Sequence, residues 1–437
     1  MNKVEPRTLP GFMELYPHEQ LEFDRIKNTI IDTYKSYGFY PLDTPIIEYS
    51  EVLLAKAGGE TEKQIYRFNK GDNDLSLRFD LTVPLARYTA EHYNELVFPF
   101  KRYQMSKVFR GERPQKGRFR EFYQCDIDVI GQEALDLLFD AEIPTVIYNV
   151  FQELNIGKFT IRVNNRKILN GFFESLNLEN QASDILRVID KIDKIGADNV
   201  TKELMEFNID SDTVSKIMSF IGIKGSNDEV IQSLRNLIMS NEQFVQGVEE
   251  LNEVINGMSD FNVPEDYFKI DLTIARGLDY YTGTVYETIL DDYPRLGSVC
   301  SGGRYENLTG YYTDEKLPGI GISIGLTRLF SQLKEIEAIN NGKKSLTQVL
   351  VIPFDRKDMN YTLNLASKIR TAGINTDVYY QNKGMKQKMK YADRLDIPYV
   401  ILIGEDEVSA NKAMLKNMLT GEQQLLSVEE IIEQLTK

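Results

Sequence analysis

The chain has 437 residues, of which 42% are hydrophobic, and a formal net charge of −15. This length and composition are typical of a globular protein with two to four domains. No run approaches the roughly 18 apolar residues that a membrane span requires, and the first residues lack the apolar core of a secretion signal, so a cytoplasmic location without membrane attachment is predicted. Two cysteines and two histidines, far apart in sequence, argue against a disulfide framework, a zinc site and Cys/His nucleophilic catalysis.

The acidic balance also argues against a surface that binds nucleic acid everywhere, because phosphate neutralisation needs clustered Lys and Arg. One segment departs from this balance. Residues 101–123 contain eight basic residues and two acidic ones. A concentrated basic segment in an acidic chain predicts a local site for a polyanion, such as nucleotide phosphates or one end of an RNA.

The first predicted element is an amphipathic helix from His18 to Tyr37, with apolar residues every four positions and Gly38 as its stop. Residues 38–48 are expected to be extended, because two prolines exclude helix. From Ile65 to Ile130, short apolar and aromatic runs alternate with polar turns, which predicts an antiparallel sheet, and residues 157–163 continue it.

Two segments of this sheet carry polar residues at every second position. Leu77–Pro84 is predicted to be a strand with Asp80 and Thr82 on one face, and Gln124, Asp126 and Asp128 share a face in the same way. Carboxylates on neighbouring strands would attract a cation or a hydrogen-bond donor. The spacing alone leaves open whether each aspartate caps a turn or contacts a ligand.

Residues 109–123 have the pattern of a β-hairpin whose loop, with Pro114 and Gly117, carries the charge. Arg110 ends the first strand, where a guanidinium can hold phosphate or carboxylate through two parallel hydrogen bonds. The alternative is a solvated hairpin, which the scarcity of acidic residues in the segment makes less attractive.

Residues 170–258 change to helical spacing and predict a helical insertion, either a solvated module or a charged face for a partner. Strand character returns at Tyr267. Residues 276–287 set one cation among three tyrosines, two carboxylates and two glycines, which favours the wall of a ligand site over an irregular structural strand.

Two glycine-rich segments follow, at residues 301–305 and 318–328. The second lacks the lysine and hydroxyl of a P-loop, so its glycines are expected to allow close packing of the backbone, with Arg328 at a helix start. After a polar linker at 340–345, strand and helix alternate, which predicts an α/β domain with parallel strands. Its lysines Lys383, Lys386, Lys388 and Lys390 read as a helix face, either simply solvated or in contact with RNA.

In this order, the segments resemble the class II aminoacyl-tRNA synthetases, and specifically the histidyl-tRNA synthetase family. Residues 42–48, 109–123 and 319–329 are similar to the three class motifs, and residues 276–287 and 301–305 to the two signatures of the histidine enzymes. The resemblance covers nearly the whole chain. It implies an α+β catalytic domain with the antiparallel class II sheet, a helical insertion and a C-terminal α/β anticodon-binding domain, with boundaries at residues 1–169, 170–260, 261–339 and 340–437.

Carried over position by position, the resemblance also implies site residues. Arg276 and Arg110 would be the catalytic cations at the α-phosphate of ATP, where no protein nucleophile is needed. No residue is implied as a protein metal ligand. The histidine pocket would comprise Asp80, Thr82, Arg110, Gln124, Asp128, Arg276, Tyr280 and Tyr281, and the ATP site Arg110, Glu112, Arg118 and Arg328.

The implied activity is that of a histidine-tRNA ligase, which activates L-histidine with ATP and Mg²⁺ and transfers it to the 3′ end of its cognate tRNA, as a homodimer. Specificity for imidazole would rest on buried hydrogen bonds, without editing. A catalytically idle, synthetase-like regulatory subunit that binds histidine is the main alternative. The three arginines at 110, 276 and 328 and the full C-terminal domain argue against it, and the segment at 276–287 argues against a synthetase for another amino acid.

Overall fold

The structure is a computed structural model that describes residues 3–55, 60–113, 117–189, 191–237, 241–274, 280–339 and 344–436. The chain forms two compact units, residues 1–14 with 25–338 and residues 15–24 with 339–437, and each is described by itself. Within the described ranges, no helix is long and apolar enough to cross a membrane. Several residues singled out in the sequence lie outside these ranges: Pro114, Lys116, Arg276, Gly277, Asp279 and the linker residues 340–343.

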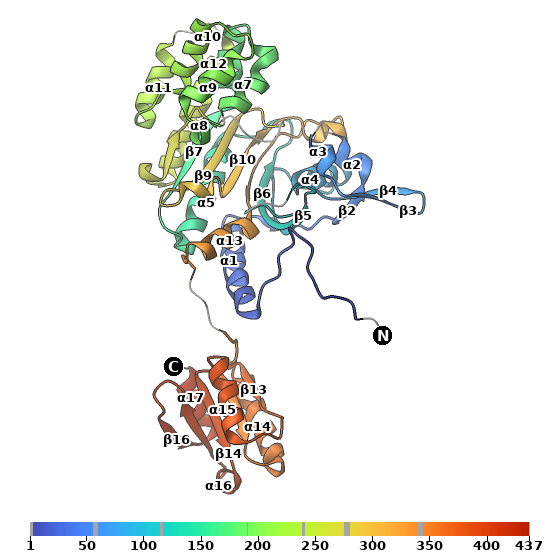
Figure 1. The fold of residues 1–437 in the computed structure, drawn as a ribbon, viewed down its shortest axis with the longest axis vertical. Helices are drawn as coiled ribbons and strands as arrows, with labels where there is room; N and C mark the ends of the chain where they lie inside the picture. The colour runs from blue at the N-terminus through green and yellow to red at the C-terminus, as the bar shows by residue number, and fades with distance from the viewer. Residues whose placement is uncertain are drawn as a thin grey trace. The chain divides into compact units, whose positions relative to one another are not determined.

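An eight-stranded sheet forms the centre of the larger unit (Figure 1). Its inner pairs are antiparallel, as the sequence predicted, whereas the two edge pairs are parallel. In spatial order the strands are β1 (Tyr40–Pro41), β5 (Phe100–Phe109), β6 (Glu121–Ile130), β11 (Gly319–Ile324), β10 (Cys300–Tyr305), β9 (Thr284–Leu290), β7 (Phe159–Asn165) and β8 (Phe268–Ile270).

One face of this sheet, called here the back face, carries the hydrophobic core. Cys125, Ile127 and Val129 of β6 alternate with polar residues and are almost completely buried. Helices α1 (Pro17–Ser36), α5 (Leu138–Leu154) and α13 (Leu326–Glu335) pack on this side, and the Tyr34 hydroxyl of α1 donates a hydrogen bond to the Cys125 carbonyl at 3.2 Å. The first helix therefore forms as predicted, and its apolar stripe is buried in the core.

A smaller sheet has three strands, in the order β2 (Ile47–Tyr49), β4 (Asn73–Leu77) and β3 (Arg67–Lys70). Helix α2 (Ser50–Leu54) packs on β2 and β4, and α3 (Glu60–Gln64) precedes β3 in the chain. The predicted strand Leu77–Pro84 is wrong, because β4 ends at Leu77 and α4 (Thr82–Glu91) begins five residues later. Pro84 falls in the first helical turn, where a missing N–H costs nothing. Asp80 and Thr82 are therefore brought together by a turn and a helix start.

The predicted helical insertion is confirmed as a helical segment. Its long helix α12 packs on α5, α6 and β7, and the helices gather at one end of the larger unit (Figure 1). Apolar residues at helical spacing are buried between them. Its helices are α6 (Arg166–Ser175), η1 (Glu179–Gln181), α7 (Ala182–Ile189), α8 (Ile192–Ile195), α9 (Ala197–Met205), α10 (Ser211–Ile221), α11 (Asn227–Asn236) and α12 (Glu242–Asp260), with η2 (Glu265–Tyr267) leading back to β8.

The smaller unit has a five-stranded sheet with helices on both faces, as expected for an α/β domain. The three strands on one side of this sheet are parallel, and two strands paired in antiparallel fashion extend the other side. The order is β13 (Thr376–Val378), β12 (Val349–Pro353), β14 (Tyr399–Ile403), β15 (Ala413–Asn417) and β16 (Gln423–Leu426). The helices are η5 (Arg356–Asp358), α14 (Met359–Thr371), α15 (Met385–Arg394), α16 (Glu405–Ser409) and α17 (Val428–Thr436).

The predicted lysine face in this unit is wrong in one respect. Lys383 precedes α15, and Lys388 is buried, with its Nζ donating a 2.6 Å hydrogen bond to the Pro353 carbonyl. Burial lowers the pKa of Lys388. This lysine therefore closes the carboxyl end of β12 and does not form a continuous exposed face with its neighbours.

Candidate active site

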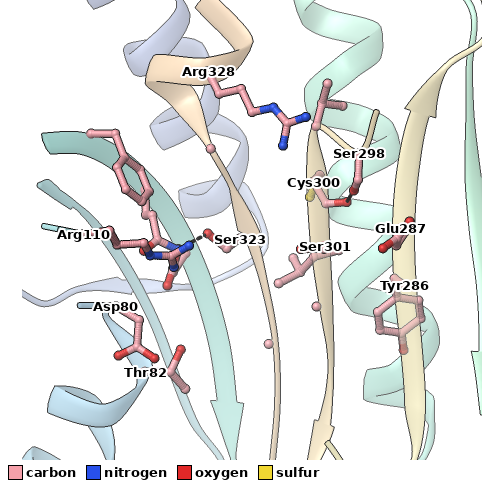
Figure 2. Close-up of a pocket in the computed structure, with 18 of the residues that line it drawn as sticks. Asp80, Thr82, Arg110, Tyr286, Glu287, Ser298, Cys300, Ser301, Ser323 and Arg328 are labelled. Carbon is pink, nitrogen blue, oxygen red and sulfur yellow. Dashed lines mark hydrogen bonds between the residues drawn. The ribbon is translucent and has the colours of Figure 1, made fainter. Parts of the chain in front are cut away.

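A cavity of about 520 Å³ opens on the other face of the large sheet, called here the front face (Figure 2). It is lined by β6, β11, β10 and β9, by the turn before α4 and by the ends of the β5–β6 hairpin. Of the predicted site residues, the structure brings ten together in its lining: Asp80, Thr82, Arg110, Glu112, Arg118, Gln124, Asp128, Tyr280, Tyr281 and Arg328. Arg276 lies outside the described residues.

Asp80 and Thr82 stand at one end of the cavity (Figure 2). The Asp80 Oδ1 accepts a hydrogen bond from the Val83 amide at 3.1 Å, which holds the carboxylate at the start of α4. Burial raises the pKa of Asp80, while the Val83 hydrogen bond and the Arg110 charge oppose that rise. Asp80 therefore caps a turn, and its place in the cavity lining keeps contact with a ligand as a prediction.

Asp128 is held from two sides at the floor of the same end. Its Oδ2 is 2.6 Å from Arg102 Nη2, and its Oδ1 accepts a 2.9 Å hydrogen bond from the Tyr305 hydroxyl. Arg102 lies directly opposite Asp128 in the pairing of β5 with β6. Burial raises the pKa of Asp128 to about 6, although Arg102 opposes the rise. Arg102 and Tyr305 were not predicted as partners of Asp128, because strand register and not local spacing brings them there.

The glycines of β11 make room for these side chains. Gly319, Gly321 and Ser323 face the front, while the intervening isoleucines are buried at the back. A Cβ at Gly321 would overlap Asp128 Oδ1, and a Cβ at Gly319 would overlap the Tyr305 ring. The prediction of close packing is confirmed at Gly319 and Gly321, where side chains of neighbouring strands approach, but not at Gly325, whose nearest neighbouring atom would be 3.8 Å from a Cβ.

Arg110 lies in the middle of the cavity, at the end of β5 (Figure 2). Its guanidinium carbon is 4.3 Å from the centroid of the Phe79 ring and 5.1 Å from that of Phe122, and its Nε donates to the Phe79 carbonyl at 3.3 Å. Flanking rings fix a guanidinium while leaving donors on its edge available for an anion. Burial lowers the pKa of Arg110, with Asp80 opposing this.

Two more arginines mark the far end. Arg328, near the start of α13, donates from Nη2 to the Leu296 carbonyl of η3 (Pro294–Leu296) at 2.6 Å. Its pKa is lowered by burial and then by the nearby positive charge of Arg118. Arg118 is 3.1 Å from Glu112. Two guanidiniums that repel each other across a cavity favour the binding of an anion between them.

Other basic residues of the 101–123 segment are paired, which corrects the expectation that acids were too few. Lys101 is 2.8 Å from Glu142, and Lys107 is 2.7 Å from Glu121. The first of these acids comes from a helix distant in sequence. The local positive charge is therefore smaller than the sequence count suggested, and it is concentrated on the arginines of the cavity.

Tyr280 and Tyr281 complete the wall at the end of the cavity that holds Asp80 and Thr82, and Tyr280 packs against Ala86 of α4. Their rings are 4.9 Å apart, and Tyr280 is 5.8 Å from Tyr305, both edge to face. Burial raises the pKa of both hydroxyls, so they stay protonated and can act as donors as well as acceptors. The predicted ligand wall is thus supported at Tyr280, Tyr281 and Glu287, which line the cavity.

The cavity is divided in charge: carboxylates and phenols stand at one end, and guanidiniums in the middle and at the other end. Such a site suits a small zwitterion with a ring of hydrogen-bonding atoms beside a polyphosphate. The fold and the cavity together agree with the class II catalytic core that the sequence resemblance implied.

Comparison with known proteins identifies the family. A model of histidyl-tRNA synthetase matches residues 11–329, and a model of the anticodon binding domain matches residues 348–437. The chain is 58% identical to the histidine–tRNA ligase of Clostridium tetani, over 98% of both chains. It is 48% identical to that of Finegoldia magna, over 99% of this chain and 100% of the relative. The crystal structure of histidyl-tRNA synthetase from Nostoc sp. PCC 7120 superposes with a TM-score of 0.91, at 43% identity and 99% coverage of both chains.

The chain therefore belongs to the histidyl-tRNA synthetase family. It is accordingly an enzyme, a ligase of the aminoacyl-tRNA synthetase type.

Proposed function

We propose that this protein activates L-histidine with ATP to histidyl-adenylate and transfers the histidyl group to the 3′ end of its cognate tRNA. The observation that carries the proposal is the division of one cavity into a carboxylate–phenol end and a guanidinium end. Near-full-length similarity to proteins named histidine–tRNA ligase supports it.

Histidine would occupy the end formed by Asp80, Thr82, Gln124, Asp128 and the tyrosine pair Tyr280–Tyr281. The imidazole nitrogens can donate to a buried carboxylate and accept from a buried phenol. A site built on such hydrogen bonds rejects an analogue that lacks them by about 10⁴- to 10⁵-fold. This selectivity removes the need for editing.

Arg110, between the two ends, would hold the histidine carboxylate and the α-phosphate together, with Arg276 as the second cation there. Glu112 and Arg118 would contact the nucleotide, and Arg328 its terminal phosphate. In the first step a carboxylate oxygen attacks the α-phosphorus and pyrophosphate leaves. Fixed cations stabilise the charge that develops on the phosphoryl oxygens, so positioning and electrostatics supply the catalysis.

Mg²⁺ is proposed as the companion of the ATP phosphates, where it neutralises charge on the departing pyrophosphate. Among the described residues, no group of three or more His, Cys, Asp or Glu could hold a metal by itself. Mg²⁺ is usually bound through phosphates and one or two carboxylates. Glu112 and Glu287 line the cavity and would be those carboxylates.

In the second step a terminal ribose hydroxyl of the tRNA attacks the adenylate carbonyl and AMP leaves. We place the catalytic domain in residues 1–169 and 261–339, the helical insertion in 170–260 and the anticodon-binding domain in 340–437. We further propose a cytoplasmic homodimer. Strand β1 is at the edge of the large sheet and β2 at the edge of the small one. The exposed apolar side chains on these two strands, Tyr40, Ile47 and Tyr49, support a partner subunit there.

The test is histidine-dependent exchange between ATP and labelled pyrophosphate, followed by histidine transfer to tRNA. Purified protein is expected to perform both, with no exchange for other amino acids. Firm histidine binding without exchange would instead indicate a regulatory, synthetase-like subunit. Exchange without transfer would restrict the proposal to its first step.

A further inference from the structure

Asp126 lies between Gln124 and Asp128 in the cavity lining, and it differs from the other carboxylates there. It is buried, and its Oδ1 has no hydrogen-bond partner among the residues that the structure describes. Asp80, by contrast, accepts from the Val83 amide, and Asp128 is bonded through both oxygens. A buried carboxylate oxygen without a hydrogen bond costs roughly 1–3 kcal/mol or more. Its position in the cavity lining therefore indicates that a donor of the ligand forms the missing hydrogen bond.

The residues paired with Asp126 in the sheet carry no charge. Its strand neighbours across β5 and β11 are the uncharged Gln104 and Ser323, of which Ser323 is a hydrogen-bond partner. Arg102 and Arg110 are nearby cations that partly offset its charge, but the Nη2 of Arg102 bonds Asp128. With Asp80 and Asp128 also close, three carboxylates share this end of the cavity. The missing partner should therefore be a cationic N–H donor.

Arg110 indicates which part of the substrate meets Asp126. Its charged neighbours include Asp80 and Asp126. In the proposed function Arg110 holds the carboxylate of histidine, and the α-ammonium is on the adjacent carbon. An ammonium with three N–H donors placed there would have Asp80, Thr82 and Asp126 as acceptors.

We propose that Asp126 is a substrate-binding residue whose free Oδ1 accepts a hydrogen bond from the α-ammonium group of histidine. This inference rests on the proposed function and deepens it. It makes Asp126 a determinant for amino acids over analogues without the amino group, and it leaves Asp128, with Arg102 and Tyr305, for the imidazole.

The experiment measures, by calorimetry, the binding of three compounds to the wild-type protein and to Asp126→Asn. The compounds are L-histidine, L-histidinol, which keeps the ammonium but lacks the carboxylate, and 3-(imidazol-4-yl)propionate, which keeps the carboxylate but lacks the ammonium. The substitution keeps the shape and removes the charge. A charged hydrogen bond is worth enough for about a 10- to 100-fold loss of affinity.

That loss is expected for histidine and histidinol, while the propionate should bind Asp126→Asn as well as or better than wild type. An equal loss for all three compounds would overturn the assignment of Asp126 to the ammonium group. Unchanged binding of histidine would show that Asp126 does not contact the substrate. If wild type itself neither binds histidine nor supports exchange, the proposed function fails instead. Gln104→Leu, which alters the uncharged neighbour on β5 outside the cavity lining, is the control and should not distinguish the compounds.

Discussion

Both faces of the large sheet bury aspartates, but the protein satisfies the hydrogen bonds of these carboxylates fully at the back and only in part at the front. At the back, Asp140 of α5 accepts from Arg304 Nε at 3.0 Å and from Nη2 at 2.6 Å, and Arg304 also donates to the carbonyls of Leu135 and Asp136. At the front, Arg102 serves Asp128, while Asp126 keeps an unfilled oxygen. A completed ion pair fixes the fold, whereas an incomplete one leaves capacity for a ligand.

The largest effect should come from the cation in the middle of the front face. Replacing Arg110 by Ala removes the charge that holds both anions, and the rate of histidine-dependent exchange should fall on the order of 10³-fold. The melting temperature should change little, because the substitution breaks no ion pair between Arg110 and a carboxylate in the described part of the protein. Arg356→Ala, on the other compact unit, is the control. Exchange within tenfold of wild type in Arg110→Ala would remove Arg110 from the mechanism.

The back face should respond in the opposite way. Asp140→Asn leaves Arg304 buried without its counter-charge, which is expected to lower the free energy of unfolding by about 3 kcal/mol. The KM for histidine should stay within about threefold at a temperature where the variant is folded. Denaturant unfolding and exchange kinetics test this together. A variant that is stable but binds histidine poorly would contradict the division between the faces.

Gly321→Ala tests the front face on β11, whose neighbouring isoleucines are buried on the back face. The added methyl would overlap Asp128 Oδ1 and displace that carboxylate from Arg102 and Tyr305. Overpacking of this kind costs about 1–3 kcal/mol, so the KM for histidine should rise roughly tenfold or more while the KM for ATP changes less. A matched substitution on the same strand, Ile320→Val, lies outside the cavity lining and should lower stability slightly and leave both KM values near wild type.

The smallest expected effect concerns pH and the histidine-free protein. Burial raises the pKa of Asp126 to about 7 and that of Asp128 to about 6, above the 3.8 of an ordinary aspartate. The folded state thus binds protons more tightly than the unfolded chain. The stability this contributes is complete below pH 3.8 and is lost as the pH rises through 6 to 7.

Asp126→Asn should therefore melt at a higher temperature than wild type at pH 8, by about 2 to 4 °C, with a smaller difference at pH 5. Thermal unfolding at both pH values measures this. The same difference at pH 5 and pH 8 would show that the front-face carboxylate is neutralised within the protein after all.

Features that depend on neighbouring residues could be predicted from the sequence, whereas features that depend on distant segments could not. The first helix, the charged hairpin and the glycine-punctuated strand were predicted, because their periodicity and glycines lie within a few residues. The turn at Asp80 was missed, because Leu-Thr-Val-Pro has strand-like residues and only the packing of α4 reveals a helix. The burial of Lys388 and the pairing of Arg102 with Asp128 depend on contacts between distant segments, which no local pattern records.

The alternation along β11 has a consequence for how this chain tolerates change. Its isoleucines contribute volume to the core, and the glycines between them contribute empty space to the substrate side. A scan of every substitution from Gly319 to Ile324 should therefore separate two kinds of damage residue by residue. Variants at Ile320, Ile322 and Ile324 should reduce how much protein a cell accumulates, whereas variants at Gly321 and Ser323 should reduce what each accumulated molecule can do.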